Sequence, residues 1–255
     1  MSELKAYFLS DTHFRSPDDL HFQKLLKFLK QKQGSQHLSH IFLLGDIFDM
    51  WLSNYSYFIE RWLPLNTELL RLKQAGVEIH YFEGNHDLFL EQYFKEQLGF
   101  HVHKGPIIMK LGPHIVRMEH GDQMDPSDYG YRFLRWVLRT DFVEWLAPRL
   151  PGDRVGRFGE NMSNKSRAAH HHSVGTPEHA ARLKELVKTH AQKFLASEDF
   201  FITGHIHTKM DFDLTLQSNN HLTRIVNLGT WYNDQEPHLY CLTSKGGEFV
   251  GLNGL

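Results

Sequence analysis

Short apolar runs alternate with longer amphipathic stretches through the first third of the chain. The ranges 4–10, 39–44 and 77–82 have the continuous apolar character of buried strands. Between them, 18–33 and 57–75 carry apolar residues at the spacing of an amphipathic helix. Strands that alternate with helices in this way favour a parallel sheet with right-handed crossovers.

Strands are predicted again further along the chain, with shorter connections between them. Three in a row are typical of a meander, at 99–103, 106–111 and 114–119. Four more lie in the final segment, at 199–203, 209–216, 222–228 and 237–242. Residues 125–195 differ from both flanks because they look helical, are rich in aromatic residues and contain clustered arginines. We predict one domain over 1–255, with 125–195 inserted into it as a helical cap.

The composition narrows the class of protein. Apolar residues make up 41% of the chain and charged residues 23%, as in ordinary globular proteins. The 28 lysines and arginines nearly balance 30 acidic residues, so the charge does not indicate a nucleic-acid partner. One cysteine excludes a disulfide framework, and the lack of a signal peptide or spanning segment predicts a cytoplasmic protein. The 19 histidines are unusually many and point to metal chemistry.

Five short segments place Asp, His or Asn directly after a predicted strand. Ligands at the carboxyl ends of strands converge on one crevice in an open α/β sheet, and adjacent glycines allow close approach. A single such histidine is usually structural, and an Asp after a strand is commonly a helix N-cap, but five segments together favour a metal centre. The candidate ligands are Asp11, His13, Asp46, Asn85, His120, His205 and His207.

The donor set restricts the kind of metal. Carboxylate oxygen and imidazole nitrogen without thiolate suit Mn²⁺ best, with Fe²⁺, Co²⁺ and Zn²⁺ as alternatives. Seven candidate ligands are too many for one tetrahedral ion, and they suit two ions that share a bridging carboxylate. Such a pair is typical of enzymes that displace a group in line at phosphorus.

The order of the motifs DTH, GDIFD, GNHD, HGD and GHIH resembles the calcineurin-like metallophosphoesterases over residues 11–207. The resemblance implies a four-layer α/β/β/α sandwich of two mixed sheets with a dinuclear centre. It implies that one metal is bound by Asp11, His13, Asp46 and His207, and the other by Asp46, Asn85, His120 and His205. It also implies that His86 approaches the substrate and that Asp49 orients it; a structural His86 and a loop or N-cap Asp49 are the alternatives.

The stretch HGDQMDPSDYGYRFLRWVLR resembles the UDP-2,3-diacylglucosamine pyrophosphatases over residues 120–170. That resemblance implies cleavage to diacylglucosamine 1-phosphate and UMP in lipid A synthesis, with peripheral contact at the inner membrane face. It implies substrate contacts at Asp128, Tyr131, Asn164 and Lys165. The chain departs from this family where GNHD replaces GNRD, which puts the titratable His86 in place of a fixed cation.

Two other functions stay open. One is hydrolysis of a soluble nucleotide or sugar phosphodiester or monoester, and the other is a non-catalytic protein-binding scaffold. An apolar groove beside the metals would favour a lipid substrate, whereas a closed polar pocket would favour a soluble one. Arg132, Arg135 and Arg139 share one face of a predicted cap helix. That face could bind a phosphorylated lipid or sugar, or it could be the solvated side of a helix packed on the core.

Overall fold

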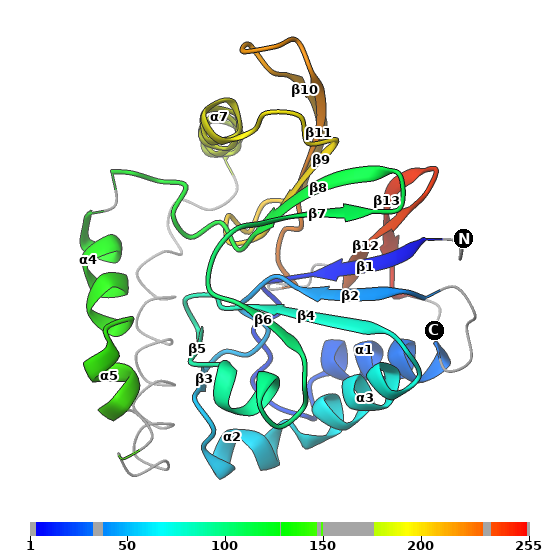
Figure 1. Ribbon diagram of the computed structural model, residues 1–255, viewed down its shortest axis with the longest axis vertical. Helices are drawn as coiled ribbons and strands as arrows, with labels where there is room; N and C mark the ends of the chain where they lie inside the picture. Colours follow the sequence, from blue (N-terminus) through cyan, green and yellow to red (C-terminus); the bar gives the residue numbers. More distant parts are fainter. Residues whose placement is uncertain are drawn as a thin grey trace.

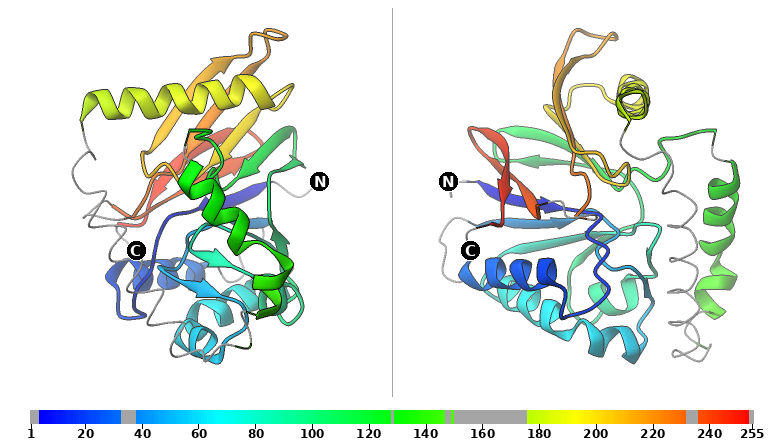
Figure 2. Two further views of the ribbon diagram at one scale, coloured as in Figure 1. Left: turned by 90° about the vertical axis from the view of Figure 1, so that its left-hand side faces the viewer. Right: turned by 180° about the vertical axis from the view of Figure 1, so that it is seen from behind.

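The computed structural model describes residues 4–32, 38–127, 129–146, 149, 176–231 and 236–253. Two mixed sheets lie face to face, with helices on their outer sides (Figures 1 and 2). This is the predicted four-layer α/β/β/α sandwich. None of the helices in the described ranges is both long and apolar enough to cross a bilayer.

The first sheet has six strands, and the last four in its order are parallel to one another. Its order is β13 (Gly246–Gly251), β12 (His238–Thr243), β1 (Lys5–Leu9), β2 (His40–Leu43), β4 (Glu78–Phe82) and β6 (His101–His103). Its outer face is covered by α1 (Leu20–Gln31), α2 (Ser56–Arg61) and α3 (Leu63–Gln74). Helix α1 covers the sheet because its apolar residues Phe22, Leu25 and Leu29 lie on one side of the helix and are all buried.

The second sheet has five strands and lies against the inner face of the first. Its order is β10 (Met210–Thr215), β11 (Leu222–Asn227), β9 (Phe200–Thr203), β8 (His114–Glu119) and β7 (Ile107–Leu111). The layer between the sheets is aromatic and aliphatic, with Phe8 stacked on Phe42 at 4.6 Å between ring centroids. Burial of such side chains is the main contribution to stability here.

The outer layer of the second sheet is α7 (Pro177–Phe194), which lies across the strands in the left view of Figure 2 and is seen end-on in the right view. Thr176 caps its N-terminus by accepting a hydrogen bond from the amide of His179, at 3.2 Å. Val187 and Ala191 are buried against Phe201 and Ile225 of the sheet. The last helix of the predicted insertion therefore belongs to the sandwich itself, while the 125–195 cap remains a prediction for the segment before it.

Two short helices, α4 (Tyr129–Leu138) and α5 (Asp141–Leu146), stand at one edge of the sandwich. They lie at the edge where strands of both sheets end. Short parallel strands β3 (Trp51–Leu52) and β5 (Asp87–Leu88) and a π-helical turn at Glu91–Lys95 complete the described elements.

The structure corrects some predicted elements. The predicted helix over 57–75 is two helices, α2 and α3, that break at Trp62, with a proline in the first turn of α3. The predicted meander is wrong, because β6 pairs parallel with β4 in the first sheet and only β7 and β8 form a hairpin. Strand β13 was not predicted, since its sequence GGEFVG is neither alternating nor strongly apolar.

Candidate metal centre

All seven predicted metal ligands follow strands whose carboxyl ends meet at one edge of the sandwich. Asp11 and His13 follow β1, Asp46 follows β2 and Asn85 follows β4 in the first sheet. His120 follows β8, and His205 and His207 follow β9 in the second sheet. The two sheets therefore both contribute ligands to one centre.

The first cluster consists of Asp11, His13 and His207. Oδ1 of Asp11 is 3.2 Å from Nε2 of His207 and 3.9 Å from Nε2 of His13. The two Nε2 atoms are themselves 3.3 Å apart. Asp11 and His13 are buried, while His207 is exposed, so this cluster opens to solvent on one side.

The second cluster consists of Asp46, His120 and His205, with Asn85 among them. Oδ1 of Asn85 is 3.1 Å from Nε2 of His120 and 3.1 Å from Nδ1 of His205. Nδ1 of His120 lies 2.8 Å from the carbonyl oxygen of Leu44. Because a carbonyl only accepts, that contact puts the hydrogen on Nδ1 and leaves Nε2 with a lone pair facing the cluster.

Asp46 lies between the two clusters. Its Oδ2 is 3.6 Å from Nε2 of His120 and 3.8 Å from Nε2 of His13. Its Oδ1 accepts a hydrogen bond of 2.9 Å from the amide of His86, which fixes the orientation of the carboxylate. This is the position that a bridging carboxylate would need.

These clusters fit divalent metal ions. Ligand atoms about 2.1 Å from one ion lie roughly 3–3.5 Å from each other, close to the spacings found here. Two imidazole nitrogens lie 3.3 Å apart and face one carboxylate oxygen. Hydrogen bonds alone satisfy these three atoms poorly, whereas a cation between them would satisfy all three. The Asp and His clusters therefore indicate divalent metal binding.

Strained backbone holds the ligands in place. Five of the seven have a positive φ: Asp11 (50°), His13 (44°), Asp46 (54°), His205 (67°) and His207 (58°). Residues other than glycine rarely adopt this left-handed conformation, which costs of order 1–3 kcal/mol at each position. Such strain concentrates at functional sites, where the surrounding fold over-determines the conformation.

Glycine is required at Gly84, between β4 and the ligand Asn85. A Cβ atom there would overlap the carboxylate and the amide of Asp46. Gly45 serves the same purpose on the neighbouring loop, where a Cβ would lie 2.6 Å from Nδ1 of His120. Both glycines let the two loops pack closely enough for their ligands to meet.

The buried charges of the centre shift one another's proton affinities. Burial alone would raise the pKa of Asp11, but the hydrogen bond and positive charge of His207 hold that pKa below its usual value. Burial would lower the pKa of His120, yet the carboxylates of Asp46 and Asp11 raise it. Burial, followed by the nearby His120, lowers the pKa of His205 to about 4. His205 is therefore a neutral imidazole, the form that binds metal.

Asp87, the last residue of GNHD, holds the loop that carries Asp46 through hydrogen bonds. This positioning role was not predicted from the sequence. Oδ2 of Asp87 accepts hydrogen bonds from the amide of Ile47 at 2.8 Å and the hydroxyl of Tyr81 at 2.9 Å. Complete burial and the charge of Asp46 raise the pKa of Asp87 to about 8. The sequence gives no signal for this role, because an Asp beside candidate ligands resembles another ligand.

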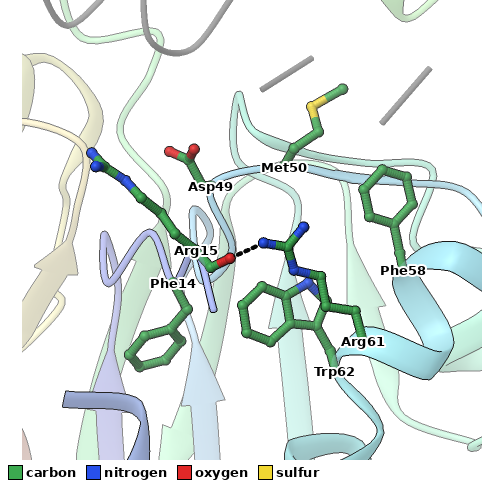
Figure 3. A pocket seen from close by; sticks show the side chains of 7 residues that line it. All are labelled: Phe14, Arg15, Asp49, Met50, Phe58, Arg61 and Trp62. Atoms are coloured by element: carbon green, nitrogen blue, oxygen red, sulfur yellow. Dashed lines mark hydrogen bonds between the residues drawn. The ribbon is translucent and has the colours of Figure 1, made fainter. Parts of the chain in front are cut away.

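His86 sits beside the clusters, with a ring nitrogen within 4.8 Å of ligand atoms of His13 and Asp46. Its Nδ1 donates to the main-chain carbonyl oxygen of Asp49, at 2.9 Å, so residue 49 orients the imidazole through its backbone. The Asp49 carboxylate lines a pocket of about 180 Å³ that also contains Arg15 and Arg61 (Figure 3). Arg61 donates a hydrogen bond to the carbonyl oxygen of Arg15 there.

A larger groove of about 560 Å³ adjoins the second cluster. His120 and Asp122 lie in its wall, together with basic side chains and apolar ones. The basic residues are Lys104, Arg117, Arg135, His190 and Lys193, and the apolar ones include Phe82, Met124, Leu186 and Phe194. Three acidic residues, Glu83, Glu119 and Asp122, also line the groove, and Glu119 and Asp122 pair with Arg117 and Arg135. The lining is therefore apolar with charges of both signs, and the groove opens beside the candidate metal ligands.

Arg135 of α4 and Arg139, the residue that follows the helix end, attach this segment to the ligand loops. Arg135 Nε is 2.5 Å from Asp122 of HGD, and Arg139 Nη1 is 2.7 Å from Glu83. Arg139 also donates to the carbonyl oxygen of Gly84, at 3.3 Å. Among the predicted substrate contacts, Asp128, Asn164 and Lys165 lie outside the described residues, as does the side chain of Tyr131.

Curated relatives cover nearly the whole chain. A UDP-2,3-diacylglucosamine hydrolase of Porphyromonas gingivalis is 29% identical over 247 residues, covering 89% of this chain and 90% of the relative. The enzyme of the same name from Neisseria meningitidis is 26% identical, covering 97% and 98%. That from Aeromonas hydrophila is 25% identical, covering 93% and 95%. The chain is related in sequence to the UDP-2,3-diacylglucosamine hydrolases. This relationship confirms the predicted resemblance and the prediction of a metal-dependent hydrolase.

Comparison with family models and with solved structures gives no further information on function. No family model matches the chain. Vacuolar protein sorting 29 from Cryptosporidium parvum has a TM-score of 0.42 and 14% identity, covering 98% of this chain and 97% of that one. A likeness this slight does not bear on function.

Proposed function

We propose that this chain hydrolyses the pyrophosphate bond of a UDP-linked diacylated glucosamine, releasing UMP and a diacylglucosamine 1-phosphate. The observation that carries the proposal is the pair of ligand clusters on either side of Asp46, next to a groove lined by apolar side chains and by charges of both signs. The basic side chains of that lining suit a pyrophosphate, and its apolar side chains suit acyl chains.

Asp11, His13, Asp46 and His207 would hold one ion, and Asp46, Asn85, His120 and His205 the other. Bound divalent ions supply Lewis-acid charge for phosphoryl oxygens and lower the pKa of water at the site. We favour Mn²⁺ because oxygen and imidazole ligands without thiolate suit it, with Fe²⁺, Co²⁺ and Zn²⁺ as alternatives.

His86 would act on the leaving side of the phosphorus. Its Nδ1 is committed to the Asp49 carbonyl, so Nε2 is the atom left to donate a proton or a hydrogen bond. A phosphate leaving group needs no proton at neutral pH, so with a pyrophosphate the imidazolium would mainly stabilise negative charge. The pocket with Arg15 and Arg61 lies next to Asp49 and would add positive charge on the same side.

The aromatic side chains of α4 and α5 would face the lipid. Five of them are exposed: Tyr129, Phe133, Trp136, Phe142 and Trp145. A soluble monomer rarely leaves so many large apolar side chains together in solvent, and such patches mark contacts with lipid or protein. We propose that they contact the acyl chains and the inner membrane face, where this substrate resides. Asp128, Tyr131, Asn164 and Lys165 are proposed to contact the sugar nucleotide.

The test is a substrate panel with the full-length, Mn²⁺-loaded protein. We expect kcat/KM for UDP-2,3-diacylglucosamine in mixed micelles to exceed that for UDP-N-acetylglucosamine by at least about 100-fold, since each buried acyl chain contributes several kcal/mol. Bis(p-nitrophenyl) phosphate serves as the small control substrate. Equal kcat/KM for the acylated and the soluble nucleotide would contradict the lipid substrate and favour a soluble phosphodiester. No hydrolysis of any of the three with two ions bound would favour a non-catalytic scaffold.

A further inference from the structure

A second group of potential ligands lies away from the predicted metal centre, on the inner face of the first sheet. His40 begins β2, Glu78 and His80 lie on β4, and His101 begins β6. The strand register puts His40 opposite Glu78 and His80 opposite His101. The predicted centre follows the carboxyl ends of β2 and β4, whereas His40 and Glu78 are at their amino ends.

Three imidazoles surround one carboxylate oxygen. Oε2 of Glu78 is 3.6 Å from Nε2 of His80, 3.7 Å from Nε2 of His40 and 4.0 Å from Nε2 of His101. These distances are too long for hydrogen bonds. They are close to the separation of about 3.4 Å between two ligands of one tetrahedral ion.

A hydrogen-bond chain fixes the tautomer of His40. The hydroxyl of Ser39 donates its one hydrogen to the carbonyl oxygen of Lys5, at 3.0 Å. It must therefore accept from Nδ1 of His40, which is 2.9 Å away. Nε2 of His40 is left with a lone pair directed toward Glu78. Metal-binding histidines are oriented by their other ring nitrogen in the same way.

His80 is positioned by a second imidazole. Its Nδ1 is 3.0 Å from Nε2 of His103, while its own Nε2 is buried and has no hydrogen-bond partner. A buried nitrogen left in this state is unfavourable by roughly 1–3 kcal/mol, and a metal ion would satisfy it. Burial and the neighbouring imidazoles lower the pKa of His80 to about 3, and burial and His101 lower that of His103 to about 4. These imidazoles are neutral at physiological pH and can bind a cation.

We propose that His40, Glu78 and His80 form a separate zinc site, with His101 as the fourth ligand. The donor set of imidazoles and one carboxylate suits tetrahedral Zn²⁺. His101 is 56% exposed and stacks on His80 at 4.6 Å between ring centroids, so a side-chain rotation brings its nitrogen to the ion. The ion would tie β2, β4 and β6 together at the edge of the sheet, and its role would be structural.

The experiment counts metal ions in the full-length chain. Protein stripped with a chelator is titrated with Zn²⁺, and bound metal is measured by mass spectrometry after gel filtration. Wild type is expected to hold one ion more than His40→Gln or Glu78→Gln, with affinity for that ion reduced at least about 100-fold in each variant. Glu248→Gln is the matched control, because Glu248 is an exposed strand residue at the far edge of the same sheet.

Two further measurements keep the result unambiguous. Saturating Zn²⁺ should raise the melting temperature of wild type and Glu248→Gln by more than that of Glu78→Gln, while the metal-free melting temperatures agree. Hydrolysis by the Mn²⁺-loaded chain should be unchanged in Glu78→Gln, since this residue is remote from the proposed reaction. Equal metal content in wild type, His40→Gln and Glu78→Gln would overturn the site. An extra ion that all variants bind equally and lose on dialysis would show adventitious binding only, and would overturn it too.

Discussion

The loops of the candidate metal centre and the helical segment 129–146 lie side by side but are built in opposite ways. In the loops, Asp11, Asp46 and His120 are buried, and positive φ angles fix the backbone of the first two. In the helices, aromatic side chains are exposed and the described attachment to the core includes two arginine ion pairs. Reaction chemistry needs ligands held to within a fraction of an ångström, while a large flexible substrate tolerates an adaptable surface.

The largest effect is expected from breaking the rigidity of the loops without removing a ligand. Gly84→Ala places a methyl group on the Asp46 carboxylate, so the two loops must separate. We expect turnover to fall by at least about 100-fold, because ångström-scale misplacement of reacting groups has effects of this size. Metal content should fall with it, as measured by mass spectrometry.

Gly251→Ala is the matched control for this substitution. A Cβ at Gly251, in strand β13, meets nothing within 4 Å, and the variant should keep both its metals and its turnover. Full metal content and activity in Gly84→Ala would show that the loops are not as tightly packed as their geometry indicates.

This rigidity marks the limit of what the sequence could predict. Apolar runs followed by Asp, His or Asn predicted which residues would meet, because strand ends in such folds share an edge. The left-handed backbone at Asp11 and His207 could not be predicted, since it is imposed by contacts between segments far apart in the chain. The same holds for β6, whose sequence HVH suits either sheet and whose place is decided by pairing with β4.

The helical segment was harder to interpret from sequence for a related reason. Arginines at helical spacing predicted one basic face, and two functions for it stayed open. Arg135 and Arg139 form ion pairs with carboxylates on the loops after β8 and β4. No pattern within the helix could reveal these partners, because they lie elsewhere in the chain. The aromatic side chains, by contrast, are exposed although aromatic residues at helical spacing are usually buried.

His86 stands between the two regions and should give an intermediate effect that depends on the leaving group. If its imidazolium is a general acid, His86→Asn should lose about 100-fold with an alkoxide leaving group and much less with nitrophenolate. The measurements are kcat and KM of wild type and variant on the two substrates at one pH.

His86→Arg is the control that separates acid catalysis from charge. An arginine keeps the positive charge but cannot give up its proton, so it should retain most activity on a pyrophosphate and little on an alkoxide ester. A loss that is independent of the leaving group in His86→Asn, together with a fully active His86→Arg, would rule out the general acid and leave charge stabilisation.

The smallest effect is expected at Arg135, and it tests whether the helical segment is attached or functional. Arg135 is half-buried, and its partner Asp122 is buried, so Arg135→Ala should reduce the free energy of unfolding by about 1–2 kcal/mol. Arg182→Ala is the matched control: its guanidinium is 74% exposed and 3.7 Å from Asp125, and exposed pairs contribute little.

If Arg135 only docks α4, KM should change by the same small factor for UDP-2,3-diacylglucosamine and bis(p-nitrophenyl) phosphate. Because Arg135 also lines the 560 Å³ groove, a rise in KM confined to the large anionic substrate would instead place its guanidinium in contact with that substrate. Urea unfolding and steady-state kinetics on the same preparations distinguish the two outcomes, since docking predicts a stability loss without substrate selectivity and contact predicts the reverse.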